Sequence, residues 1–271
     1  MLPLPITWFE LIQGKSFIVG LKKYGFRRDY SSQLLRDAGF SNLELVDGWD
    51  GYADKEATDQ MLKTLEMELP PSGKYGPSIG YGHKGCTLSH VLLWKRIVDE
   101  NIPYAFIFED DVIPHTDLKK GLGQEYWSLT LEHKFDIVYL GNMLNPKDMR
   151  IYDSSEKILE SGTYCLHAYL ITLEGAKRIL SDFVKTTKER GFIHMVDVEL
   201  YYMQIENRMK YCCWNGKNVP KCYPTFAEDL PWQFFPCIIL PQKDTGLFYQ
   251  NYRMGTSVGQ EELQLTIPKY D

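Results

Sequence analysis

The sequence predicts an α/β fold in which a mainly parallel central sheet is flanked by helices. Short apolar runs, rich in β-branched and aromatic residues, alternate with longer segments in which apolar residues recur every three or four positions. The clearest strand, Tyr104 to Phe108, leads directly into the carboxylates Glu109, Asp110 and Asp111. Because buried parallel strands carry their chemistry at their carboxyl ends, we expect a functional site where this strand ends.

The first part of the chain reads as a strand, a helix and a second strand. The first strand covers Ser16 to Leu21, and the stretch Lys22 to Tyr30 leads into a helix that ends near Ala38-Gly39. The second strand, Leu43 to Val46, stops at Asp47-Gly48. A unit of this kind builds a parallel sheet with its ligand crevice at the strand ends.

The alternation continues after a predicted long loop. Prolines and glycines mark this loop: Pro70, Pro71, Gly73, Gly76, Gly80, Gly82 and Gly85. The elements predicted next are a helix from Thr87 to Asn101, strands from Tyr104 to Phe108, Phe135 to Leu140 and Ala168 to Thr172, and a helix from Leu173 to Lys185. From Tyr211 onward the pattern breaks up into aromatic residues, prolines and short runs. We therefore expect a main domain over residues 1–210 and a subdomain or lid over residues 211–271, which can also belong to the same domain.

Composition excludes several classes of partner. The 271 residues are 44% hydrophobic and carry a formal net charge of −6, so no broad positive field attracts nucleic acid or anionic lipid. No run of eighteen apolar residues occurs, and residues 1–13 lack a basic start followed by an apolar core. These features predict a soluble, cytoplasmic protein without a membrane span.

The six cysteines do not form a recognisable metal or disulfide pattern. They lack paired C-x-x-C spacing, which argues against structural zinc and favours free buried thiols. A disulfide between Cys213 and Cys222 stays open for an oxidising compartment, because the residues between them are rich in turn formers.

The acidic triplet is the strongest candidate for chemistry. Three adjacent carboxylates repel one another, so they need a cation, a proton or cationic partners, and a divalent metal with oxygen ligands is the simplest choice. Side chains alternate along a strand, so Glu109 and Asp111 can share a face, whereas Asp110 joins them only if the strand has already turned. The alternative is a solvated acidic turn.

Two motifs in a fixed order carry a family resemblance. Gly85-Cys86-Thr87-Leu88-Ser89-His90, followed after one helix by Phe106 to Val112, resembles the pattern of glycosyltransferase family 25. This family includes bacterial lipooligosaccharide β-galactosyltransferases and collagen hydroxylysine galactosyltransferases. Other stretches match in the same order, over roughly residues 16–200: Val19 to Leu21, Arg27 and Arg28, Val46 to Gly48, Tyr169 to Thr172, Gly175 and Ala176, and Met195 to Asp197. The chain departs from the pattern at Gly20 and at His83-Lys84, which leaves the identity of the nucleotide sugar open.

The resemblance implies a nucleotide-sugar-binding fold of the GT-A type and a UDP-hexose donor. In such a fold an acidic triplet holds Mn²⁺ or Mg²⁺ against the donor diphosphate. By resemblance, Asp111 is the main metal ligand and Glu109 the second, while Glu109 and Asp110 contact ribose or sugar hydroxyls or reach the metal through water. Further donor-binding positions implied in this way are Leu21, Arg28, Asp47, Ser89 and His90.

Several of these residues also have purely structural interpretations. Ser89 and His90 at a helix start can face a phosphate, or they can serve as a cap and a packed imidazole. Arg27 and Arg28 can bind the base or the diphosphate, or lie on a solvated basic helix face. Cys86 is expected to pack in the core. Three aromatic residues offer a platform for an acceptor sugar or belong to the core: Trp232, Phe234 and Phe235.

The resemblance also implies inversion at the anomeric carbon, which needs a carboxylate to accept the proton of the acceptor hydroxyl. Asp197 is the candidate base, although it also fits an exposed acid in the first turn of a helix. Glu228 and Asp229 are the fallback.

The function expected is therefore metal-dependent transfer of a hexose, galactose first and glucose second, from a UDP-sugar to a glycan hydroxyl. The partners expected are a nucleotide sugar and a glycan or glycoconjugate acceptor, with peripheral contact to a lipid-linked acceptor left open. Two alternatives remain. One is a non-catalytic nucleotide- or carbohydrate-binding module. The other is a metal-dependent phosphohydrolase, which is disfavoured because Glu109 stands where that chemistry needs an aspartate nucleophile.

Overall fold

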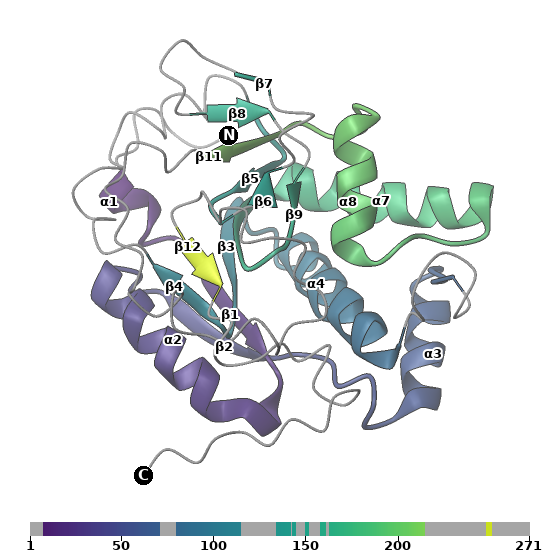
Figure 1. The fold of residues 1–271 in the computed structure, drawn as a ribbon, viewed down its shortest axis with the longest axis horizontal. Helices are drawn as coiled ribbons and strands as arrows, with labels where there is room; N and C mark the ends of the chain where they lie inside the picture. The colour runs from purple at the N-terminus through teal and green to yellow at the C-terminus, as the bar shows by residue number, and fades with distance from the viewer. Residues whose placement is uncertain are drawn as a thin grey trace, which may run out of the picture.

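The computed structural model describes residues 8–70, 80–114, 134–141, 143–144, 150–151, 158–160, 163–214 and 248–250. Within these residues the centre is an eight-stranded sheet in the order β2-β1-β3-β10-β5-β11-β8-β7 (Figure 1). Its strands are β1 (Ser16–Gly20), β2 (Leu43–Asp47), β3 (Tyr104–Glu109), β5 (Ile137–Tyr139), β7 (Arg150–Ile151), β8 (Ile158–Glu160), β10 (Ala168–Thr172) and β11 (Tyr211–Trp214). Two small ladders pair β4 (Val112–Pro114) with β12 (Phe248–Gln250) and β6 (Met143–Leu144) with β9 (Thr163–Tyr164).

The predicted α/β class, a central sheet flanked by helices, is confirmed. β1 pairs in parallel with both β2 and β3, and β5 pairs in parallel with β11. In detail the sheet is mixed, because β10 runs antiparallel between β3 and β5. Buried strands read as continuous apolar runs in either direction, so the sequence pattern did not reveal this reversal.

Helices cover both faces of the sheet. They are α1 (Trp8–Leu11), η1 (Lys22–Tyr24), α2 (Gly25–Ala38), α3 (Lys55–Thr64), α4 (Tyr81–Asp99), α7 (Leu173–Arg190) and α8 (Val196–Ile205). Helix α2 lies on one side, and α3, α4, α7 and α8 lie on the other (Figure 1). Among the described residues, no helix combines the length and the apolar character needed to cross a membrane.

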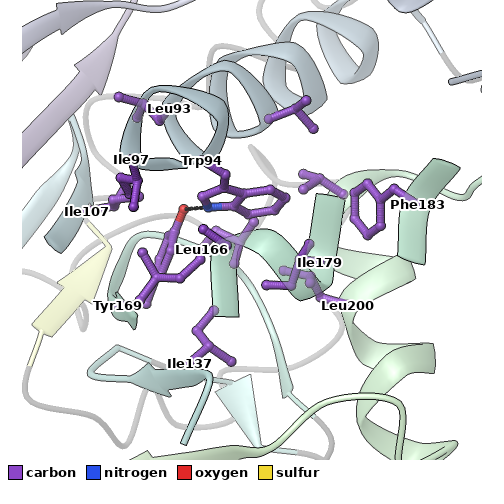
Figure 2. Close-up of a cluster of buried hydrophobic side chains, with 14 of the residues drawn as sticks. Leu93, Trp94, Ile97, Ile107, Ile137, Leu166, Tyr169, Ile179, Phe183 and Leu200 are labelled. Carbon is purple, nitrogen blue, oxygen red and sulfur yellow. Dashed lines mark hydrogen bonds between the residues drawn. The ribbon is translucent and has the colours of Figure 1, made fainter. Parts of the chain in front are cut away.

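Alternation along β3 assigns its side chains to two hydrophobic cores. Phe106 and Phe108 pack with Leu35 of α2 and Phe40, and Phe40 meets both rings edge-on. Ala105 and Ile107 belong instead to the core built with α4, α7 and α8. Trp94 of α4 lies in the middle of that second core, surrounded by aliphatic side chains from the neighbouring elements (Figure 2). This two-sided burial makes β3 a rigid support for the residues that follow it.

Two helices differ from the prediction: one begins earlier than expected, and the other was not expected. α4 begins at Tyr81, six residues before the expected Thr87, so Gly82 and Gly85 lie inside it. A Cβ on Gly85 would collide with the backbone of Trp49 and Gly51, so this glycine permits close packing of the helix on the loop after β2. Helix α3 was not predicted at all. It begins at Lys55 and is capped by Asp54, whose side chain accepts a hydrogen bond of 2.8 Å from the Ala57 N–H.

The C-terminal part of the chain is described only in small pieces. β11 starts at Tyr211 and lies inside the central sheet beside β5. The division at residues 210 and 211 therefore stays a prediction for the rest of the segment. Several candidates lie outside the described residues: Cys222, Glu228, Asp229, Trp232, Phe234 and Phe235.

Candidate functional site

The acidic triplet is divided between the two faces of the sheet. Glu109 is the last residue of β3 and continues the alternation toward α4. Asp110 and Asp111 form the turn between β3 and β4, and both contact Arg27 of α2. The strand has therefore already turned after Glu109, and Asp111 lies with Asp110 rather than with Glu109.

Arg27 compensates the charge of the two aspartates. Its Nη2 lies 2.7 Å from Oδ1 of Asp110 and 3.0 Å from Oδ2 of Asp111, and the side chain is only 1% exposed. The solvated basic face considered for Arg27 is thus wrong. Burial raises the pKa of Asp110 to about 7, with Asp111 adding to the rise and Arg27 opposing it. The triplet consequently has a cationic partner inside the protein.

Gly20 explains one departure from the family pattern. It ends β1, which is the neighbour of β3 in the sheet. A Cβ at this position would overlap the carboxylate of Asp110. A glycine is therefore needed here for Asp110 to reach Arg27.

Glu109 contacts His90, whose ring is held on its other side by Tyr169. Oε1 of Glu109 lies 3.3 Å from Nε2 of His90, and Nδ1 of His90 lies 2.8 Å from the Tyr169 hydroxyl. The indole N–H of Trp94 donates to the same hydroxyl over 2.9 Å, the dashed line in Figure 2. Burial would raise the pKa of Glu109, but the hydrogen bond and the charge of His90 lower it overall. Tyr169 and Trp94 thus orient the His90 ring on the α4 side of the site.

Cys86 completes a compact group of donors with His90 and Glu109. One ligand atom from each of the three lies within 4.8 Å of the others. Burial raises the pKa of the Cys86 thiol well above its ordinary value, and the nearby carboxylates of Glu109, Asp197 and Asp111 add to this rise. Cys86 also packs against the second core, as the sequence analysis expected.

Ser89 does not lie at a helix start. It lies eight residues into α4, so the predicted exposure to free helix N–H groups is wrong; the error follows from the misplaced N-terminus. Its hydroxyl donates to the Gly85 carbonyl over 2.7 Å and accepts from the Trp49 N–H over 2.8 Å. Ser89 therefore fastens the loop after β2 onto α4.

The remaining donor-side candidates gather at the carboxyl ends of β1 and β2. Gly20 and Asp47 are partners in the register of β1 and β2, and Leu21 is the residue between Gly20 and η1. Arg28 of α2 forms an ion pair with Asp47, whose side chain is 59% exposed. These ends lie on the same sheet edge as the end of β3, because the three strands are parallel.

Asp197 lies at the start of α8, which is joined to α4 by a 3.3 Å hydrogen bond from the Val196 N–H to the Thr87 hydroxyl. It occupies the first turn of α8 and is partly buried, and its carboxylate accepts a 2.9 Å hydrogen bond from the Val198 N–H. Burial raises the pKa of Asp197; the Val198 N–H opposes the rise and the charge of Glu109 adds to it. Glu109 and Asp197, which are 88 positions apart in sequence, are thus near enough for the charge of Glu109 to influence the pKa of Asp197.

Sequence reasoning missed the supporting residues Tyr169 and Trp94. Both belong to apolar patterns that predict core burial, and nothing in those patterns marks a Tyr169 hydroxyl that contacts His90 or a Trp94 N–H that donates to this hydroxyl. Arg27 and its partners Asp110 and Asp111 all lay within the quoted family stretches, but nothing in the sequence showed that they pair.

The comparisons with known proteins identify the family of the chain. The model of glycosyltransferase family 25, described as an LPS biosynthesis protein family, matches residues 13–198. Over 171 residues the chain is 27% identical to a "Probable inactive glycosyltransferase 25 family member 3" from Bos taurus, covering 61% of this chain and 28% of that protein. Over 143 residues it is 31% identical to the "Lacto-N-neotetraose biosynthesis glycosyltransferase LgtE" of Neisseria meningitidis, covering 49% of this chain and 50% of the relative.

A third relative is the "Procollagen galactosyltransferase 1-A" of Xenopus laevis, which is 28% identical over 176 residues, or 61% of this chain and 28% of that protein. The matched parts thus span half or less of these curated relatives. The family model nevertheless covers well over half of this chain and includes the acidic triplet, the α4 motif and Asp197. The chain belongs to glycosyltransferase family 25.

Proposed function

We propose that this chain is a metal-dependent, inverting glycosyltransferase of the GT-A type. It transfers a hexose, galactose first and glucose second, from a UDP-sugar to a hydroxyl of a glycan or glycoconjugate. The observation that carries the proposal is that Glu109, at the carboxyl end of β3, exerts an electrostatic influence on Asp197 in the first turn of α8. The procollagen galactosyltransferase among the relatives supports galactose as the sugar.

Asp197 acts as the general base. An inverting displacement requires one carboxylate that accepts the proton of the acceptor hydroxyl as the new glycosidic bond forms. Because burial and the field of Glu109 raise the pKa of Asp197, its carboxylate is more basic than an ordinary exposed aspartate. Its place at the first turn of α8 fixes the side chain on a helix rather than on a loop.

The donor chemistry of the site fits a hard divalent cation in part. The carboxylates of Glu109 and Asp111 are ligands suited to Mn²⁺ or Mg²⁺, whereas the imidazole of His90 beside Glu109 is not one of the oxygen ligands that these ions prefer. Glu109 and Asp111 would hold this cation if Asp111 turned from Arg27 toward Glu109, because the structure directs the two carboxylates to different sides of the sheet. Bound there, the metal supplies positive charge that stabilises the departing nucleoside diphosphate.

The donor nucleotide binds along the shared edge of β1, β2 and β3. Leu21, Arg28 and Asp47 lie at the ends of the first two strands, and Asp110 lies beyond the third. Arg28 provides the cation and Asp47 an exposed carboxylate for ribose hydroxyls. Ser89 and His90 reach this edge from α4. We assign these six residues to the donor site.

A second candidate function is binding without turnover. It is favoured by one comparison, because the bovine relative is named as probably inactive. In this reading the chain binds a nucleotide or a carbohydrate through the same edge, and Asp197 has no role in proton transfer. Family membership gives no comparable support to a phosphohydrolase.

The test is a binding and turnover panel on the full chain. UDP-, GDP- and CMP-sugars are each titrated calorimetrically with Mn²⁺ and with EDTA, and release of the nucleoside diphosphate is followed with and without glycan acceptors. We expect one UDP-hexose to bind only with metal. Asp111→Asn should lose this binding, whereas Asp99→Asn, which changes an exposed ion pair on α4, should keep it.

The outcomes separate the two functions. Metal-dependent binding with release of UDP supports the enzyme, and binding without release under every acceptor supports the binding module. If no nucleotide sugar binds under any metal condition, the enzyme and the nucleotide-binding module are both wrong.

A further inference from the structure

A second set of metal-ligand atoms lies on the α4 side of Glu109. A thiol sulfur from Cys86, a ring nitrogen from His90 and a carboxylate oxygen from Glu109 lie within 4.8 Å of one another. Cys86 and His90 are one helical turn apart on α4, so their side chains share a face. We propose that these three side chains form a binding site for a transition-metal cation of the zinc class.

The spacing of two of the ligands already suits such a cation. Zinc bonds of about 2.0–2.2 Å to nitrogen and oxygen place two tetrahedral ligands about 3.3–3.5 Å apart. Nε2 of His90 and Oε1 of Glu109 are 3.3 Å apart. The sulfur of Cys86 lies within 4.8 Å of a ring nitrogen of His90 and a carboxylate oxygen of Glu109, so it needs an approach of at most about 1.3 Å to complete the third position. A water or another ligand would take the fourth.

The histidine also has the outer partner typical of a metal ligand. Its Nδ1 lies 2.8 Å from the Tyr169 hydroxyl, and this hydroxyl is itself held by the indole N–H of Trp94. When Nε2 binds a metal, the ring proton resides on Nδ1 and is donated to the Tyr169 oxygen, while the Cys86 thiol releases its proton to solvent. The buried Trp94–Tyr169 pair, which Figure 2 shows, thus fixes the ring whose Nε2 faces Glu109.

The donor set selects the class of cation. A thiolate and an imidazole favour Zn²⁺ and Co²⁺ over Mg²⁺ and Mn²⁺, whose preferred ligands are oxygens. Asp110 and Asp111, by contrast, contact Arg27 on the α2 side. Zinc bound at Cys86, His90 and Glu109 would compete with a hard cation for Glu109. This competition rests on the proposed function, whereas the zinc site itself does not.

The first test is a titration of the full, reduced chain with Co²⁺ alone, without nucleotide. The wild type should bind one ion with a thiolate-to-cobalt charge-transfer band in the near ultraviolet. Cys86→Ser should lose this band, and Cys86→Ala serves as a second variant if the first fails to fold. Cys212→Ala, in the core on the opposite face of the sheet, is the matched thiol control and should titrate like the wild type.

The outer partner is tested separately. Tyr169→Phe should keep the charge-transfer band but weaken the affinity about 10- to 100-fold, because the ring loses the hydrogen bond that orients it. Circular dichroism confirms that each variant is folded. Absence of the band in the wild type, or an unchanged band in the Cys86 variants, would overturn the proposal.

A competition experiment distinguishes this inference from the proposed function. Zn²⁺ should suppress Mn²⁺-dependent binding of the UDP-sugar in the wild type and should do so at least tenfold less effectively in Cys86→Ser. If no UDP-sugar binds but the cobalt band is present, the proposed function fails and the metal site stands. If the sugar binds and the band is missing, the metal site is wrong and the proposed function stands.

Discussion

Arg27 and Asp110 form a buried ion pair below the carboxyl end of β3, with 2.7 Å between Nη2 and Oδ1 and side-chain exposures of 1% and 6%. The same nitrogen reaches Asp111, so one guanidinium compensates two neighbouring carboxylates. Helix α2 is thereby joined to the turn that ends the central strand. The pair stands directly beside the proposed donor edge, and its role is therefore structural as well as electrostatic.

Removal of Arg27 should destabilise the fold strongly. Arg27→Met keeps the length of the side chain but leaves two buried carboxylates without their cation, and breaking a buried pair in this way costs about 3–5 kcal/mol. Urea unfolding measures the change. Arg36→Met, on an exposed position of the same helix, is the control and should stay within about 0.5 kcal/mol of the wild type. Equal stability of the two variants would show that the ion pair is unimportant.

Gly20→Ala should disturb the same pair from the opposite side. The added methyl group would overlap the Asp110 carboxylate, so Asp110 must shift away from Arg27; overpacking of this kind costs about 1–3 kcal/mol. Gly25→Ala is the matched control, because a Cβ there meets no atom within 4 Å and the residue begins α2. This control should be neutral or more stable by up to about 1 kcal/mol. If the two alanines have the same effect on the urea midpoint, the overlap does not govern Gly20.

The arrangement of these residues shows what the sequence could and could not predict. The strands around Phe106 and Leu170 were predictable because continuous burial selects β-branched and aromatic residues. The position of Glu109 at a strand end followed from the same pattern. The pairing of Asp111 with Arg27 did not, because it depends on where the strand turns and on how α2 packs.

The helix before β3 shows a second limit. Gly82 and Gly85 read as loop residues, yet both lie in α4. At position 85 the close approach of Trp49 selects a glycine inside the helix. Such a contact between distant segments leaves no periodic trace. Tyr169 is similar: its ring follows the apolar pattern, whereas its hydroxyl serves His90.

Acid should weaken the fold through Glu44. This carboxylate on β2 is paired with Arg96 of α4 and with Lys15. The hydrogen bond from Arg96 lowers its pKa most; burial opposes this effect and Lys15 adds to it, so the pKa falls to about 2. Because the folded-state pKa lies below the ordinary value of 4.5, this contribution to stability is present above about pH 4.5 and is lost as the pH falls toward 2. Glu44→Gln should therefore narrow the difference in urea midpoint between pH 6 and pH 3.

The control for Glu44 is another carboxylate in an ion pair. Glu66→Gln removes the contact with Lys188, in which both side chains are more than 60% exposed, so solvent screens the interaction. It should leave the pH dependence close to that of the wild type. The same narrowing in both variants would mean that Glu44 has no special part in acid sensitivity.

Asp197→Asn separates proton transfer from binding. The amide keeps the size of the side chain and can still accept from the Val198 N–H, but it cannot take a proton from the acceptor hydroxyl. If Asp197 is the base, transfer should fall by about 10²- to 10⁴-fold while the affinity for the UDP-sugar with Mn²⁺ changes little. Initial rates of UDP release and calorimetric titration of the donor give the two quantities. Glu206→Gln, at the exposed C-terminal end of the same helix, should leave both unchanged. Retained transfer in Asp197→Asn would assign the base to another residue, and equal losses of binding and transfer would assign Asp197 to the donor site instead.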